Sequence, residues 1–136
     1  MNDAKYYDPA KVRLIVGVFD ITGFSDGDKL KIEPVTKDYF KSHVGVDGDT
    51  SFSKVHDNRY TITFTLKPGS PSNSQLDLLR KTNAPFPVAV TNTSEGGYIG
   101  GGTDARIIER PATTFSGEEQ PIEWKILIPD YSELRL

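Results

Sequence analysis

The sequence predicts a mainly β protein, a β-sandwich or half-barrel with one α-helix at its flank. Three observations support this prediction. The chain of 136 residues contains 12 Gly and 9 Pro, which is typical of many strands joined by turns. Several short segments alternate apolar with polar residues, as half-buried strands do. One segment, residues 72–81, instead has the start signals and the apolar face of a helix. The length fits a single domain, 1–136.

The best-defined unit is a strand that leads into this helix. Residues 60–66 place apolar side chains at every second position, and the polar positions between them are Thr61, Thr63 and Thr65. Lys67-Pro68-Gly69 then ends the strand, because Pro lacks a backbone donor and Gly opens the turn. Ser72-Asn73-Ser74 offers side-chain caps for the helix that follows. A strand feeding a short helix is therefore the core motif that we expect.

The chain before this unit begins with a polar segment, residues 1–10, that contains Tyr6 and Tyr7. It is either a frayed terminus or an arm that docks on a neighbour. Residues 11–21 are expected to form one strand that is covered on both sides, because both of its faces are apolar. A tight turn at Asp26-Gly27 and a return strand at 30–35 follow, and Pro34 confines the return strand to a sheet edge.

Residues 36–53 are expected to project from the body as a long hairpin or a mobile loop, with a turn at 47–49. The segment contains three aromatic residues, Tyr39, Phe40 and Phe52. Aromatic side chains on a projecting loop indicate a protein contact, and the alternative is that they fold back onto the body.

The second half of the chain continues the strand pattern. We expect a rigid connection at 83–87, a strand at 88–91, the most flexible stretch of the chain at 95–102, and a strand at 104–110. A polar loop leads to a last strand at 122–128, in which Trp124 belongs to the core. Residues 131–136 are expected to be a tail.

Composition and motifs favour no catalytic, cofactor or metal site. The chain has no Cys, a net charge of −3 and no block of like charge, so neither thiolate chemistry nor broad attraction to nucleic acid is expected. The N-terminus has no apolar signal region and no segment reaches the length of a membrane span, which predicts a soluble protein without a membrane anchor. Asp26-Gly27-Asp28 and Asp47-Gly48-Asp49 are turn sequences rather than full calcium loops. The glycine run at 96–102 lacks a phosphate-loop Lys. His43 and His56 have no third ligand, and no nucleophile elbow accompanies them.

Several of these segments together resemble the tail tube proteins of tailed bacteriophages and of phage-derived contractile particles such as tailocins. The resemblance lies in Val16-Gly17-Val18 with residues 21–28, in Val44-Gly45-Val46-Asp47-Gly48, and in residues 61–66 with Ser70-Pro71-Ser72-Asn73 and Leu76. The order of arm, hairpin, long loop, strand, helix start and a closing strand with Glu123-Trp124 also agrees. It spans nearly the whole chain.

The resemblance implies a structural virion protein rather than an enzyme. Six subunits would form a ring whose inner strands merge into a lumen-lining β-barrel, and rings would stack into a tube. The arm and the long loop would bridge to neighbouring rings, which makes Tyr6, Tyr7, Tyr39, Phe40 and Phe52 the interface candidates. Thr61, Thr63 and Thr65 form the polar face that a lumen strand needs.

The resemblance also implies partners and a location. These are copies of the chain itself, a sheath, baseplate and tape-measure proteins, in a particle made in the bacterial cytoplasm. DNA would pass without specific binding, or the tube would puncture an envelope. Two alternatives stay open, namely the inner tube of a secretion or extracellular contractile injection system and a small ligand-binding β-barrel, which requires a closed apolar pocket.

Overall fold

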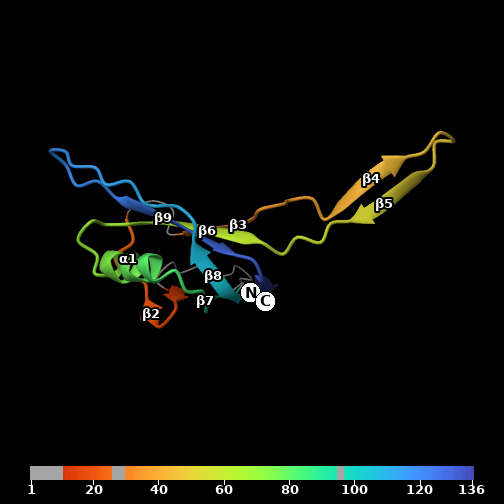
Figure 1. The fold of residues 1–136 in the computed structure, drawn as a ribbon. Coiled ribbons are helices and arrows are strands. Elements are labelled where there is room, and N and C mark those ends of the chain that lie inside the picture. Colours follow the sequence, from red (N-terminus) through yellow and green to blue (C-terminus); the bar gives the residue numbers. More distant parts are fainter. Residues whose placement is uncertain (1–10, 26–29, 95–96) are drawn as a thin grey trace, which may run out of the picture.

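A computed structural model describes residues 11–25, 30–94 and 97–136 of the chain. These residues form β1 (Val12–Val16), β2 (Phe19–Asp20), β3 (Leu30–Pro34), β4 (Phe40–Val44), β5 (Thr50–Lys54), β6 (Tyr60–Leu66), α1 (Ser72–Thr82), β7 (Phe86–Asn92), β8 (Tyr98–Ile107), β9 (Ile122–Ile128) and β10 (Ser132–Arg135). Figure 1 shows a body of strands with α1 on one side, from which the hairpin β4–β5 extends far outward.

Most of the strands form one antiparallel sheet, and β8 connects its two parts. The strand order is β2-β1-β7-β8-β9-β6-β3, and β10 also pairs with β8. The first half of β8 lies between β7 and β10, whereas Arg106 and Ile107 in its second half pair with β9. Side chains from β1 and β7 share one core with side chains from β6 and β9. The sheet therefore folds over on itself, and the predicted mainly β sandwich with a flanking helix is confirmed.

The core is built by the period-2 pattern of β6 and β9. Ile62, Phe64 and Leu66 are at most 1% exposed, and Phe64 and Ile62 stand opposite Trp124 and Ile126 in the ladder. Each such side chain contributes roughly 1.5–3 kcal/mol by leaving water. The predicted strands 60–66 and 122–128, and the core position of Trp124, therefore agree with the structure.

Helix α1 closes this core with Leu76, which is fully buried. The expected side-chain cap is absent, because the N-cap is Pro71 and makes no side-chain hydrogen bond. The nearby serines instead tie the start of the helix to Thr22, in the segment that follows β2. The Ser72 hydroxyl accepts from the backbone N–H of Thr22 at 3.0 Å, and the Ser70 hydroxyl donates to the Thr22 carbonyl at 2.6 Å. Polar residues at a helix start thus serve tertiary contacts here.

The expected single strand at 11–21 is wrong. The chain turns back at Gly17 and Val18, so that Val16 pairs with Phe19. Gly17 has a φ of +63°, a conformation that favours glycine and permits the tight turn. Val18 is consequently 89% exposed instead of lying on the buried face. The turn expected at Asp26-Gly27 lies outside the described residues, whereas β3 is an edge strand as Pro34 predicts.

Two expectations for the second half of the chain are also wrong. The stretch expected to be most flexible, 95–102, is a paired strand over most of its described part, since Tyr98 to Gly102 form the first half of β8. Residues 95 and 96 lie outside the described residues. A Cβ at Gly101 would collide with the backbone of Val88, and one at Gly100 would collide with the hydroxyl of Tyr131. These glycines are therefore required by close packing. The expected tail at 131–136 contains β10, which pairs with β8.

Candidate assembly surfaces

The hairpin β4–β5 is the most exposed ordered element of the described chain. All residues of both strands are exposed, and the pairing of Phe40 with Lys54 through Val44 with Thr50 is regular. The turn closes with hydrogen bonds from Gly45 N to Asp49 O and from Gly48 N to Gly45 O. The 47–49 sequence thus forms a turn.

The two faces of this hairpin differ in character. Cross-strand neighbours share a face, so the register places Phe40, Val44 and Phe52 on one face together with Ser42, Thr50 and Lys54. We call this the apolar hairpin face. The opposite face carries Lys41, His43, Ser51 and Ser53. The rings of Phe40 and Phe52 pack edge to face with their centroids 6.4 Å apart, and the two residues are 52% and 69% exposed.

The base of the hairpin is held by Asp57. Its carboxylate accepts from the Thr36 hydroxyl at 2.6 Å on the incoming leg, and from the backbone N–H and guanidinium of Arg59 on the outgoing leg. The hydrogen bonds from Arg59 and Thr36 hold the pKa of Asp57 well below its usual range. The Lys54 ammonium also lies 5.7 Å from the centre of the Tyr39 ring. These contacts at the base of the hairpin therefore fix its direction relative to the body.

A second surface is the polar face of strands β3, β6 and β9. Thr61, Thr63 and Thr65 alternate with fully buried residues and point away from the core. Thr63 lies between Lys31 and Lys125, and Thr61 lies beside Glu33. Lys31 is 3.6 Å from Glu33, and Lys125 is 3.7 Å from Glu109. This face is therefore polar and carries charges of both signs.

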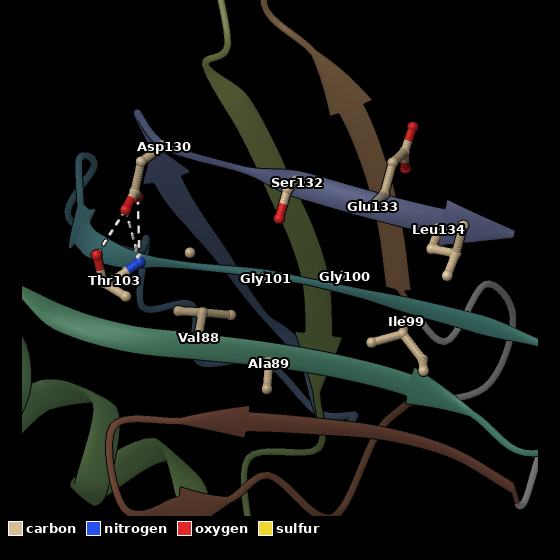
Figure 2. Close-up of a pocket in the computed structure, with 11 residues that line it drawn as sticks. Val88, Ala89, Ile99, Gly100, Gly101, Thr103, Asp130, Ser132, Glu133 and Leu134 are labelled. Atoms are coloured by element: carbon tan, nitrogen blue, oxygen red, sulfur yellow. Dashed lines mark hydrogen bonds between the residues drawn. The ribbon is translucent and has the colours of Figure 1, made fainter.

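A third surface is a trough on the outer side of β7, β8 and β10, which Figure 2 shows. The register aligns three small residues of these strands, Ala89, Gly101 and Ser132, in one row across the sheet. Ile99 and Leu134, in the next row, form its wall and are 53% and 58% exposed. The hollow has a volume of about 460 Å³. We call it the glycine trough.

Strand β10, which forms one side of the trough, is fixed from the inner side of the sheet by a partly buried polar cluster. Glu133 accepts from Tyr98 at 2.5 Å, from Tyr60 at 3.1 Å and from Arg135 at 3.1 Å, and Tyr98 and Tyr131 share a hydrogen bond. Burial alone would raise the pKa of Glu133, but these hydrogen bonds outweigh burial and lower it. Burial raises the pKa of Tyr98, and its hydrogen bonds raise it further. The C-terminal strand is thus firmly attached.

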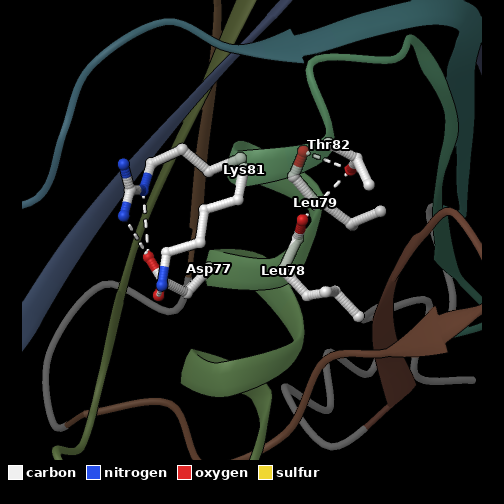
Figure 3. Close-up of polar contacts among 6 residues, drawn as sticks. Asp77, Leu78, Leu79, Lys81 and Thr82 are labelled. Carbon is white, nitrogen blue, oxygen red and sulfur yellow. Dashed lines mark hydrogen bonds and ion pairs between the residues drawn. The ribbon is translucent and has the colours of Figure 1, made fainter.

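A fourth surface is the outer side of α1, shown in Figure 3. Asp77 receives the guanidinium of Arg80 and the ammonium of Lys81 one turn later, an arrangement that supports a helix surface modestly. Leu78 beside them is 58% exposed. One carboxylate thus faces two cations, so this group of residues keeps one net positive charge.

The two histidines lie apart from the contact of Phe40 with Phe52 on the hairpin and from the trough. His43 lies on β4 and His56 follows β5, and both are exposed. In the described parts of the chain, no group of three or more His, Cys, Asp or Glu is arranged to hold a metal ion. No helix among the described residues is long and apolar enough to cross a lipid bilayer.

The sequence-predicted contact residues therefore divide into three sets. Tyr39, Phe40 and Phe52 are exposed on or beside the hairpin. The three threonines of β6 lie together on the polar sheet face. Tyr6 and Tyr7 lie outside the described residues. Sequence reasoning missed the trough, because its row joins positions 89, 101 and 132, and only the register of three strands reveals this alignment.

Comparison with known proteins gives structural matches only. No protein-family model and no curated protein matches the sequence. A chain in the structure of the anti-feeding prophage cap (AFP tube terminating cap) matches with a TM-score of 0.65 and 11% identity, over 100% of this chain and 95% of that chain. A chain in the structure of the sheath/tube terminator of PVC, an extracellular contractile injection system, matches with a TM-score of 0.66 and 12% identity, over 98% of this chain and 99% of that chain.

A chain of the native gene transfer agent virion matches with a TM-score of 0.61 and 10% identity, over 96% of this chain and 99% of that chain. The chain shares its fold with components of phage-like injection particles. At these identities the likeness establishes the fold and no more.

Proposed function

We propose that the chain is a non-catalytic structural subunit of a phage-like tail or injection tube, in which six copies form a ring and rings stack. The observation that carries this proposal is the hairpin β4–β5. A two-stranded hairpin is marginal in water by itself, and this one extends two phenylalanines into solvent far from its own body. Such an element gains stability when a neighbouring copy covers it.

The polar sheet face supports a role as the wall of the lumen. In a ring, the open edge of β3 would pair with a strand of the next copy and so satisfy donors and acceptors that otherwise promote aggregation. Thr61, Thr63 and Thr65 would then face the channel. Because lysines and glutamates alternate on this face, its charge is nearly balanced, and DNA or another cargo would pass without being held.

The proposed setting is a particle with a sheath, a baseplate and a tape-measure protein, assembled in the bacterial cytoplasm. Tyr39, Phe40 and Phe52 would contact the adjacent ring, and the arm with Tyr6 and Tyr7 would do the same. The related alternative is the inner tube of a secretion or extracellular injection system. A ligand-binding barrel is less well supported, because the space between the two parts of the sheet is filled by the hydrophobic core.

A second candidate role is that of a ring that ends the tube. It is favoured by the likeness to the AFP tube terminating cap and to the PVC sheath/tube terminator. The two roles differ in how many rings can stack: rings of a tube subunit continue to stack, whereas a terminator forms a single ring.

Negative-stain microscopy of the purified chain, over a range of protein and salt concentrations, tests the proposal. Stacked sixfold rings support a tube subunit, single rings support a terminator, and monomers under every condition contradict both. A variant with residues 38–55 replaced by a short Gly-Ser linker should keep its circular dichroism melt and form rings that do not stack. The matched control shortens the exposed loop at 113–119 and should stack normally.

A further inference from the structure

The glycine trough has the features of a receiving surface. Its row of small residues is a depression between larger side chains, and Ile99 and Leu134 expose aliphatic surface along one side. Leu136, two residues beyond Leu134, is also 68% exposed. Exposed apolar surface concentrated in this way marks a contact site more often than scattered single residues do.

One carboxylate, that of Asp130, stands at the rim of the trough. The side chain of Glu133 lies on the opposite face of β10, where it binds Tyr60, Tyr98 and Arg135. Asp130 accepts from the backbone N–H of Thr103 at 3.0 Å and from its hydroxyl at 2.6 Å, so the carboxylate is fixed at the rim. A complementary surface should therefore be apolar in its centre and basic at its margin.

The apolar hairpin face has this composition. Phe40, Val44 and Phe52 form its centre, and Lys54 lies on the same face beside Phe40. The strands β4 and β5 contain Lys41 and Lys54 but no acidic residue. Most of the large hydrophobic side chains that are exposed among the described residues lie on the hairpin or beside the trough.

The hairpin cannot reach the trough of its own chain. It extends away from the body (Figure 1), and β7 and β8 lie within that body, where β10 pairs with β8. A closure within one chain would also require the contacts of Asp57 with both legs of the hairpin to break. The occupant must therefore come from a second copy.

We propose that the glycine trough receives the apolar hairpin face of a second copy of this chain, with Lys54 near the carboxylate of Asp130 at the rim. The inference rests on the proposed function, because it names the surface on which the bridging hairpin docks. Such a contact also accounts for the position of the small-residue row, Ala89, Gly101 and Ser132, beside the exposed aliphatic side chains of Ile99 and Leu134. The contact is heterologous, so it continues from copy to copy.

Cysteine cross-linking tests this contact, because the natural chain has no Cys. Ser42→Cys lies in the centre of the apolar hairpin face and Ser132→Cys in the trough row, and both serines are exposed. A disulfide forms only when the two Cα atoms approach to about 4.4–6.8 Å. The double variant, assembled and then oxidised, should give a ladder of cross-linked chains on a non-reducing gel.

Two matched controls fix the geometry. Ser53→Cys with Ser132→Cys uses the opposite hairpin face, and Ser42→Cys with Ser74→Cys uses the exposed surface of α1. Neither control pair should give a ladder. A ladder that is equally strong in all three pairs would indicate random collision and overturn the proposal.

The results distinguish a failure of the proposed docking surface from a failure of the proposed function. Stacked rings without a Ser42→Cys/Ser132→Cys ladder would overturn the docking surface and leave the proposed function intact. The absence of rings and ladder together would count against the proposed function itself. A further variant, Leu134→Asp, should abolish stacking, while Val18→Asp, at a more exposed apolar position elsewhere, should not.

Discussion

The replacement of Phe52 by Ser separates a residue that stabilises the subunit from one that stabilises the assembly. The side chain is 69% exposed, so about 140 Å² of an aromatic surface of roughly 200 Å² is available to a partner. At about 25 cal/mol per Å², its complete burial contributes about 3.5 kcal/mol per contact, which corresponds to about a 400-fold change in the association constant.

The free subunit should hardly respond to the same change. In the single chain Phe52 contacts Phe40 in an edge arrangement, which is worth about 1 kcal/mol at most. The expected result is therefore a melting temperature within a few degrees of the wild type, together with a concentration threshold for assembly that rises about 400-fold. Pelleting of assembled material over a concentration series measures the threshold, and circular dichroism measures the melt.

The core residue Phe64 is the matched control, since it is 1% exposed. Phe64→Ala should lower the stability of the subunit by about 3–5 kcal/mol. If Phe52→Ser lowers the melting temperature as strongly as Phe64→Ala does, or leaves the assembly threshold unchanged, then the assignment of the hairpin to an intersubunit contact is wrong.

Three further predictions concern the fold. Trp124→Phe removes the indole donor to Asn73 Oδ1 at 3.0 Å and should lower the free energy of unfolding by about 1–2 kcal/mol in a denaturant titration; an unchanged midpoint would show that this bond is not needed to attach α1. Gly101→Ala should prevent folding or cost several kcal/mol, because its Cβ would collide with the β7 backbone, whereas Gly48→Ala, at a turn with free space, should lose only about 1 kcal/mol from its φ of +83°; similar losses in both variants would contradict this. Hydrogen bonds from Arg59, Arg80 and Thr103 lower the pKa values of Asp57, Asp77 and Asp130, so their stabilisation is complete above the unfolded pKa near 4 and is lost as the pH falls through the lower folded values. Thermal melts should therefore weaken below about pH 4, and Asp57→Asn should flatten that dependence, whereas an unchanged slope would indicate that Asp57 is not coupled to folding.

The parts of the fold that local sequence patterns predicted are those decided by side-chain alternation. β6 and β9 alternate without interruption, so their boundaries and their buried faces follow from period 2 alone. The strand break at Gly17 was missed because apolar residues continue the same alternation on both sides of the turn. Local pattern cannot distinguish one long strand from two short ones when the turn residue leaves the hydrophobic periodicity intact.

The parts that were missed depend on contacts between distant residues. Gly100 and Gly101 were interpreted as flexible because glycine is permissive by itself, but the reason for them is the close approach of Val88 and Tyr131. The segment expected to be a tail is strand β10, and hydrogen bonds from Tyr60 and Tyr98, which are distant in the sequence, hold its Glu133 in place. For the candidate site the exposed aromatic hairpin was predictable from composition, whereas the glycine trough was not.

The continuity of β8 has a mechanical consequence. One unbroken strand, Tyr98–Ile107, belongs to the β7 ladder at one end and to the β9 ladder at the other. A force applied to either part of the sheet thus reaches the other along covalent backbone and not only through the softer packing of side chains. The two parts cannot slide past each other unless ladder hydrogen bonds break, which makes the subunit stiff along that strand.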